Sequence, residues 1–420
     1  MTIELSSSQT APPPEFSTPD SLSAELETWQ RHIRALAEEI GPRGSTTEGE
    51  RRGHEYCQRV LAGLGFEPQW ESFRSARSAF HPFLLVALFI LGAYLIYPLF
   101  GRVSVATAAL LALVVFIFAV MELTLRENPL RKLVAKAGSQ NVVAQLPSQE
   151  VHRQDLVLIG HVDSQHTPLI FQSSGWLRAY QVFSTSAFVA FAGMVLLYIL
   201  GIFTQWGWIW PVSTITAVFA LLLGGVCLQA VSSPFTCGAN DNATAAGLVL
   251  ALAGSLGEAP LKYTRLWLVC TGSEEALHDG AIDFFRQHRR EMVNPKTLVF
   301  EGLGGAGPSW LVKEGIVLPI LPDPELIALA ESVSRQHPEL GAYPSQLSGG
   351  VTEMSDSIKA GVPALTLMGL TRDNALPYWH QIEDTVDHID PQALARNYAF
   401  AWHFIQAYDR QAKSGQQSGR

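Results

Sequence analysis

Charged residues are scarce in this 420-residue chain: Asp, Glu, Lys and Arg make up 16% of it, against about 25% in an average soluble domain. The deficit is concentrated in two stretches. Residues 179–240 contain no charged residue, and residues 78–121 contain only Arg102. Segments of this length without charge do not form a water-exposed surface, so they are expected to be buried in lipid or in a protein core.

Cysteine is also rare, and the four cysteines show no disulfide framework, since Cys227 lies inside an apolar run. This pattern is compatible with a reducing compartment. The first twenty residues lack the basic start and apolar centre of a signal peptide, and their Ser, Pro and Thr content predicts disorder. A net charge of -9 argues against nucleic acid as a partner.

The charge-poor stretches contain four apolar runs, each about the 20 residues that a helix needs to cross a bilayer: residues 82–100, 103–121, 182–203 and 208–231. The connections within each pair are so short that they allow only tight helical hairpins. Trp206, Trp208 and Trp210 suit a membrane interface. The alternative is a pair of buried core helices, but four runs favour an integral membrane protein with two hairpins and the lipid bilayer as a partner.

Basic residues predict the orientation of these hairpins. Arginines and lysines flank their outer ends, whereas the tips contain only Arg102. The polar part of the chain is therefore expected on the cytoplasmic side.

The remaining sequence predicts one α/β domain interrupted by the hairpins. Apolar strand candidates such as 155–163, 264–273 and 296–303 alternate with helical stretches such as 242–257. This alternation predicts a mostly parallel, mixed sheet covered by helices on both faces. The expected organisation is a disordered tail, three parts of the α/β domain separated by two hairpins, and a flexible tail, with these bounds: 1–22, 23–77, 78–121, 122–178, 179–231, 232–412 and 413–420.

Polar residues follow several of the predicted strands. His161 and Asp163 end one strand, Glu274 and Glu275 follow another, and Glu301 ends a third. Ligands gather at the carboxyl ends of strands in sheets of this kind. Asp241 lies before a predicted helix and His380 lies near the end of the chain. Any one of these residues could be an ordinary cap or turn residue, but their joint occurrence predicts a functional site.

The order His161-x-Asp163, Gly238-Ala-x-Asp241-Asn, Glu274-Glu275, an acidic strand end and then His380 resembles the co-catalytic zinc aminopeptidases, to which glutaminyl cyclases are related. The segments "IGPRGSTTEGERRG" and "SDSIKAGVPALTL" are also similar to that family. The resemblance covers roughly residues 26–73, 141–167 and 234–408. It implies the zinc exopeptidase fold, here with two inserted transmembrane hairpins, and a peptide substrate with a free amino terminus.

The resemblance also implies two Zn²⁺ ions, for which Co²⁺ or Mn²⁺ could substitute. Asp241 would bridge the metals, with His380 and Glu275 on one and His161 and Glu301 on the other. Asp163 would hydrogen-bond the His161 ring and fix its tautomer. Glu301 stands where this family most commonly carries aspartate. A shift of the strand end or of the side chain is expected to accommodate the extra methylene so that Glu301 still binds the metal.

Glu274 would then be the general base, taking a proton from the water between the metals and returning it to the leaving amine. Two other functions stay open: a single-zinc, glutaminyl-cyclase-like acyltransferase and a non-catalytic scaffold. A transporter is disfavoured because the spans contain no charged residue that could mark an ion path.

The remaining conspicuous side chains are given structural interpretations. Phe284 and Phe285 are predicted in the core, and Asp384 and Asp387 are predicted to orient the loop that carries His380. Four histidines match no ligand position and are predicted at the surface or in loops: His54, His166, His278 and His388. The sequence does not predict the preferred amino-terminal residue or the oligomeric state.

Overall fold

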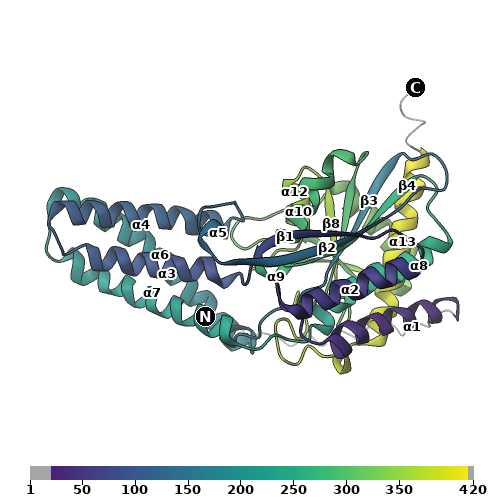
Figure 1. Cartoon of the computed structure of the whole chain (residues 1–420), viewed down its shortest axis with the longest axis horizontal. Helices are drawn as coiled ribbons and strands as arrows, with labels where there is room; N and C mark the ends of the chain where they lie inside the picture. The colour runs from purple at the N-terminus through teal and green to yellow at the C-terminus, as the bar shows by residue number, and fades with distance from the viewer. Residues whose placement is uncertain (1–19, 415–420) are drawn as a thin grey trace, which may run out of the picture.

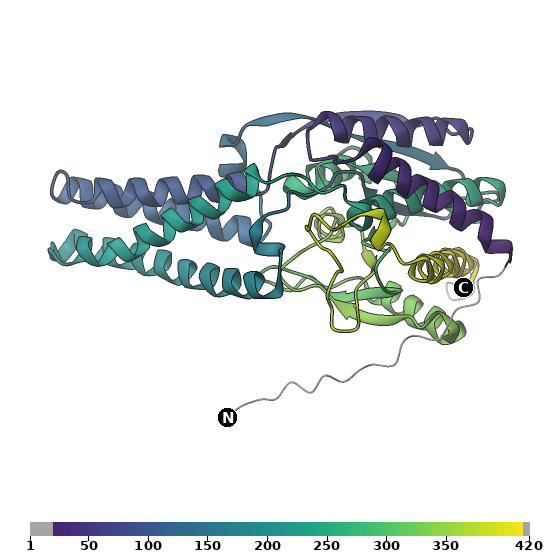
Figure 2. The same cartoon turned by 90° about the horizontal axis from the view of Figure 1, so that it is seen from below.

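A computed structural model of the chain describes residues 20–414. Most of the predicted amino-terminal and carboxyl-terminal tails lie outside these residues. Two regions lie along the long axis of the molecule, a four-helix bundle and a sheet domain covered by helices (Figures 1 and 2).

The sheet has eight strands in the order β1-β2-β4-β3-β5-β8-β6-β7. The central strands β4, β3, β5 and β8 are parallel, whereas β1, β2 and the β8-β6 pairing are antiparallel. The predicted mixed α/β fold is therefore confirmed. The strands are β1 Gln69–Ala76, β2 Lys136–Leu146, β3 Gln154–His161, β4 Thr264–Thr271, β5 Lys296–Glu301, β6 Ser309–Lys313, β7 Tyr343–Gln346 and β8 Ala364–Met368.

Successive residues along the central strands pack against helices on opposite faces, as the alternation of side chains in a strand requires. Leu156 and Leu158 of β3 join the core beneath α1, α2, α8 and α13, whereas Val157 and Ile159 pack towards α10 and α12. The helices of the sheet domain are α1 Asp20–Arg34, α2 Glu48–Gly63, α5 Leu130–Leu133, α8 Thr244–Glu258, α9 Glu274–Leu277, α10 Asp279–His288, α11 Pro324–Gln336, α12 Met354–Lys359 and α13 Pro391–Ser414.

The starts of two of these helices reflect local sequence. Thr47 caps α2 by accepting a hydrogen bond from the Glu50 amide, and Asp323 caps α11 by accepting one from the Leu326 amide. Each cap satisfies an amide that has no partner within its own helix.

The structural interpretations of single side chains hold in part. Phe284 and Phe285 are buried in the core, and His388 is exposed, as predicted. The prediction for His54 is wrong: it lies on α2, is fully buried and bonds the Glu50 carbonyl oxygen. His166 lies in a loop between β3 and α6, as predicted, but it is buried and its ring stacks on that of Phe235.

The two charge-poor stretches form two helical hairpins, as predicted, and these pack together into a single bundle. α3 packs against α4 and α7, and α6 packs against the same two helices. The bundle helices are α3 Phe80–Ile96, α4 Arg102–Leu123, α6 Ser174–Thr204 and α7 Ile209–Ser232. α4, α6 and α7 are long and apolar enough to span a membrane, whereas the apolar α3 is shorter, with 17 residues.

The bundle is apolar outside as well as inside. Small residues such as Ala93, Ala108 and Ala220 are fully buried between the helices, which allows the close approach typical of helices packed in lipid. Outward-facing side chains such as Leu110 (63% exposed) and Leu196 (69% exposed) are equally apolar. This exterior supports association with a membrane.

Candidate metal centre

The predicted site residues come together at the carboxyl ends of the central strands. His161 ends β3, Glu301 ends β5, and Glu274 and Glu275 begin α9 three residues after β4. Asp241 lies on the short turn η3 Ala239–Ala243 between α7 and α8, and His380 lies in the loop between β8 and α13. All six side chains are buried.

Asp241 lies between the two histidines. Its Oδ1 is 3.4 Å from His161 Nε2, and its Oδ2 is 3.3 Å from His380 Nε2. Each carboxylate oxygen therefore faces a different imidazole. This is the arrangement of a carboxylate that can bridge two cations.

Each histidine also has a glutamate beside it. His380 Nε2 is 3.3 Å from Glu275 Oε2, and His161 Nε2 is 3.6 Å from Glu301 Oε2. Two groups, His161-Asp241-Glu301 and Asp241-Glu275-His380, bring one ligand atom from each residue within 4.8 Å of one another. A third group, His161-Glu274-Glu275, meets the same spacing. The first two are the sets that the sequence resemblance implies.

The electrostatics of the cluster suit cations. Burial raises the pKa of Glu301 to about 7 and raises the pKa of Glu275, although both face histidines. Burial acts to lower the pKa of His380, but Glu275 and Asp241 more than offset this effect and raise it to about 10. Among the described residues, Glu275 Oε1 and His380 Nδ1 are buried without a hydrogen-bond partner. Nitrogen and oxygen donors in this number, without thiolate, fit zinc.

Asp163 acts mainly on the two glutamates. Its Oδ1 accepts a hydrogen bond from the Glu274 amide and its Oδ2 one from the Glu275 amide, both at 3.1 Å. His161 Nδ1 lies 3.0 Å from the main-chain oxygen of Asp163 and 3.5 Å from its carboxylate. Asp163, which was expected to orient the His161 ring, therefore faces Nδ1 with its main-chain oxygen as well as its carboxylate.

Asp384 positions Asp241. Its two carboxylate oxygens accept hydrogen bonds from the amides of Asn240, at 2.6 Å, and Asp241, at 3.0 Å. The side chain thus ties the His380 loop to the Asp241 turn, a wider role than the one predicted from sequence. Asp387, by contrast, is exposed.

Gly238 begins the turn that carries Asp241. Its φ is +57°, and a Cβ there would lie 2.4 Å from the Asp241 carbonyl oxygen. Both the backbone angle and the close approach therefore require glycine at this position.

His278 is the main site residue that the sequence analysis missed. Its Nε2 lies 3.4 Å from Glu274 Oε1, and its Nδ1 is 2.7 Å from Asp356 Oδ2. The ring therefore connects Glu274 to a buried carboxylate 78 residues further along the chain. The turn depends on a left-handed backbone at Ser273 (φ +52°) and His278 (φ +58°), which residue types alone do not indicate.

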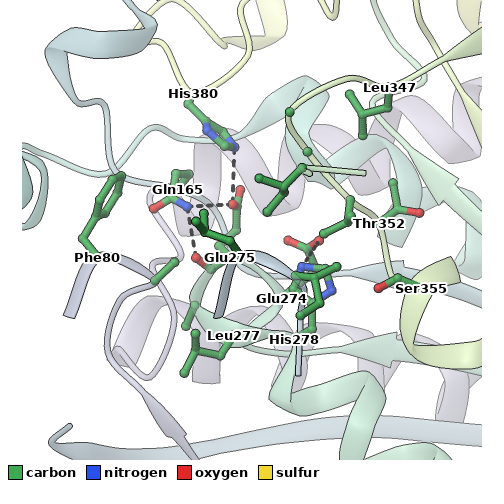
Figure 3. Close-up of a pocket in the computed structure, with 18 of the residues that line it drawn as sticks. Phe80, Gln165, Glu274, Glu275, Leu277, His278, Leu347, Thr352, Ser355 and His380 are labelled. Carbon is green, nitrogen blue, oxygen red and sulfur yellow. Dashed lines mark hydrogen bonds and ion pairs between the residues drawn. The ribbon is translucent and has the colours of Figure 1, made fainter. Parts of the chain in front are cut away.

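Gln165 and Glu50 were also missed. Gln165 Nε2 donates to Glu275 Oε2 at 2.8 Å and so holds the carboxylate directly (Figure 3). Glu50 Oε1 accepts hydrogen bonds from the Ser273 amide at 2.7 Å and from Ser139 Oγ at 2.9 Å. Glu50 therefore fixes the main chain immediately before Glu274.

Arg43 connects the loop that follows His161 to the turn that carries Asp241. Its guanidinium is fully buried and donates to the carbonyl oxygens of Val162, Cys237 and Gly238 at 2.7–2.8 Å, as well as to two carbonyl groups nearby in the sequence. Burial lowers the pKa of Arg43 to about 10, so the side chain stays cationic at neutral pH. One residue thus joins the His161 loop to the Asp241 turn.

A cavity of about 340 Å³ opens over the cluster. Five of the six clustered side chains line its floor: Asp241, Glu274, Glu275, Glu301 and His380. Figure 3 shows the cavity with Glu274, Glu275 and His380 around it. Part of its wall comes from the base of the bundle: Phe80, Phe83, Leu123 and Tyr180. The candidate site therefore lies at the junction of the two regions.

Fold and site together define a mixed α/β protein with a buried carboxylate-histidine cluster at its strand ends. Residues 222–405 match the model of peptidase family M28, so this part of the chain is similar to that family. The matched stretch includes Asp241, Glu275, Glu301 and His380. A search of curated proteins finds no match.

Solved structures share the fold. A leucine aminopeptidase precursor and a glutaminyl cyclase from Bacteroides thetaiotaomicron each superpose with a TM-score of 0.55 at 11% identity, covering 94% of this chain and 99% of theirs. A Zn-dependent exopeptidase from Parabacteroides distasonis superposes with a TM-score of 0.53 at 10% identity, covering 95% and 99%. At 10–11% identity, these likenesses show a shared fold.

Proposed function

We propose that the protein is a membrane-anchored di-zinc aminopeptidase that removes amino-terminal residues from peptides. The observation that carries this proposal is the position of Asp241, whose two oxygens face two separate histidine-glutamate pairs. His161 and Glu301 would hold one zinc, His380 and Glu275 the other, and Asp241 both. Zinc bound there would supply positive charge that polarises the scissile carbonyl and lowers the pKa of water.

Glu274 is the proton carrier in this proposal. Its carboxylate lines the floor of the cavity, and its Oε2 is 3.7 Å from His161 Nε2. It takes a proton from the attacking water and returns it to the leaving amine. Asp163 holds the Glu274 amide, and His278 holds Glu274 Oε1, so the carboxylate is oriented before substrate binds.

A single-zinc glutaminyl cyclase is the second candidate. Glu301 Oε2 accepts a hydrogen bond from Asn242 Nδ2 at 3.0 Å, a contact compatible with Glu301 as a hydrogen-bond partner rather than a ligand. A non-catalytic scaffold is less well supported, because both ligand groups and Glu274 are retained.

A substrate panel separates these functions. Purified full-length protein loaded with zinc is incubated with aminoacyl amides and with peptides that begin with glutamine. The aminopeptidase proposal expects release of free amino acids from several amides. Cyclisation of glutaminyl peptides without amide hydrolysis would contradict it, and inactivity of fully loaded protein on both would favour the scaffold.

We further propose that the bundle anchors the enzyme with the sheet domain in the cytoplasm, because basic residues gather at the base of the bundle. A cysteine replacing Gln205, between α6 and α7, should react with a membrane-impermeant thiol reagent in intact cells. A cysteine replacing the exposed Gln149 of the sheet domain should react only after permeabilisation. The reverse pattern would place the sheet domain outside.

A further inference from the structure

A second cavity, of about 800 Å³, lies between the base of the bundle and helices α10 and α12. Thr124, Leu125 and Arg126, which directly follow α4, form one wall. This second cavity adjoins the cavity over the metal cluster, with which it shares Leu125, Arg131, Ser355, Asp356 and Lys359, but none of the described candidate ligands lines it. It lies beside the end of a helix long enough to span a membrane.

The cavity is basic although the chain as a whole carries a net charge of -9. Two acidic residues, Glu127 and Asp356, line it. The basic side chains around it are Arg126, Arg131, Arg286, Arg289, Arg290 and Lys359.

Half of these cations already have carboxylate partners. Arg131 pairs with Glu122, Arg286 with Asp283, and Lys359 with Asp356. These pairs fix the walls of the cavity but leave little positive charge for a ligand.

The other three cations are available. Within residues 20–414, Arg126, Arg289 and Arg290 form no ion pair, and Arg289 Nη2 reaches only the Gly361 carbonyl oxygen, at 3.5 Å. Of the two acidic residues that line the cavity, Asp356 is paired with Lys359. The three arginines therefore face one remaining carboxylate, that of Glu127. Guanidinium groups bind phosphate oxygens through paired N–H donors, so three of them around one cavity suit a phosphate group.

One edge of the cavity is apolar. Leu318, Pro319 and Ile320 line it, and they belong to the segment between β6 and α11. Leu318 is 56% exposed and the nearby Leu321 is 65% exposed. Apolar side chains clustered beside the end of an apolar helix favour contact with lipid rather than water.

We propose that this cavity binds the phosphate of an anionic phospholipid headgroup. Arg126, Arg289 and Arg290 hold the phosphate, and the acyl chains run along α4 and the apolar segment. A free phosphate ion would use the same arginines but would leave Leu318 and Leu321 facing water, so the lipid accounts for more of the surface. The proposal concerns binding alone and holds whichever reaction the metal cluster performs.

The test uses full-length protein in an uncharged detergent, with phosphatidylglycerol, phosphatidylcholine or inorganic phosphate added. Native mass spectrometry counts retained lipids, and the unfolding temperature reports stabilisation. The variant Arg126→Gln/Arg289→Gln/Arg290→Gln removes the available cations. Its matched control, Arg59→Gln/Arg335→Gln/Arg410→Gln, removes three exposed arginines from α2, α11 and α13.

Phosphatidylglycerol should be retained and should raise the unfolding temperature of wild type more than phosphatidylcholine does. The triple variant should bind it roughly a hundredfold more weakly, because each basic side chain near a membrane surface contributes about a fivefold factor. The control should bind like wild type. Equal stabilisation by inorganic phosphate alone would overturn the lipid assignment in favour of free phosphate. The site would be overturned if wild type showed no preference for the anionic lipid, or if the control variant lost as much lipid binding as the Arg126/Arg289/Arg290 variant.

Discussion

The sheet domain and the four-helix bundle differ in the polar groups that they bury. The sheet domain buries the carboxylates of the metal cluster, two histidines and the guanidinium of Arg43 at one edge of its sheet. The bundle buries hydroxyl groups and, at its base, the Glu122 carboxylate. Its helices carry only Arg102, Glu122 and Arg178 as charged residues, all towards helix ends. Charge is thus concentrated where cations or hydrogen bonds can compensate it, and it is avoided where lipid would surround it.

The difference assigns separate tasks to the two regions. Removing a buried charge from the sheet domain should remove activity or stability in large steps. Removing a polar group from the bundle should cost little, because van der Waals packing of small residues holds its helices together.

The largest effect is expected for Glu274→Gln, which keeps the shape of the side chain but cannot accept a proton. Turnover should fall by about 10²–10⁴-fold, the usual contribution of a positioned acid-base group. Zinc content, measured on the same sample, should be unchanged. Leu110→Ala on the outer face of α4 is the matched bundle control and should keep wild-type turnover. Near-normal hydrolysis by the Glu274→Gln variant would rule out Glu274 as the base.

Arg43→Met should give the second largest effect, on the order of 3–5 kcal/mol of lost unfolding free energy, because several buried carbonyl groups lose their donor. Urea unfolding followed by tryptophan fluorescence measures it. Arg59→Met on the exposed face of α2 should change stability by about 0.5 kcal/mol or less. Equal unfolding midpoints for the two variants would show that the Arg43 network does not stabilise the fold.

A small effect is expected inside the bundle. Ser213 Oγ donates to the Trp210 carbonyl oxygen, so the Tyr198 hydroxyl, 3.0 Å away, donates to Ser213. Tyr198→Phe should lower the free energy of unfolding by about 0.6 kcal/mol, as is usual for hydrogen bonds between membrane helices. A double-mutant cycle with Ser213→Ala isolates this interaction. If Tyr198→Phe lowered the unfolding free energy as much as Arg43→Met does, the proposed difference between the two regions would be wrong.

Much of the site could be predicted because it follows strand ends. His161, Glu275 and Glu301 each come after an apolar run that the structure shows as β3, β4 or β5. The strands β6 and β7 were missed because they are short, and because β7 contains Pro344 and shows little apolar alternation. Neither carries a candidate ligand.

The supporting contacts could not be predicted in the same way. Arg43 bonds carbonyl groups from two distant segments, at Val162 and at Cys237 and Gly238. Every residue type carries a carbonyl, so the sequence shows no partner for Arg43. His278 reaches Glu274 and Asp356 only through a turn with two left-handed residues. The single bundle is likewise a tertiary result, since two separate hairpins satisfy the same apolar pattern.

The central claim is that Asp241 joins two metal positions, and anomalous scattering at the zinc absorption edge tests it most directly. Crystals of the full-length protein grown with excess zinc should show two peaks, one beside His161 and Glu301 and one beside His380 and Glu275, with Asp241 between them. Glu301→Ala should selectively weaken the first peak and leave the second. One fully occupied peak in wild type, with Glu301 turned away from it, would contradict the two-metal account.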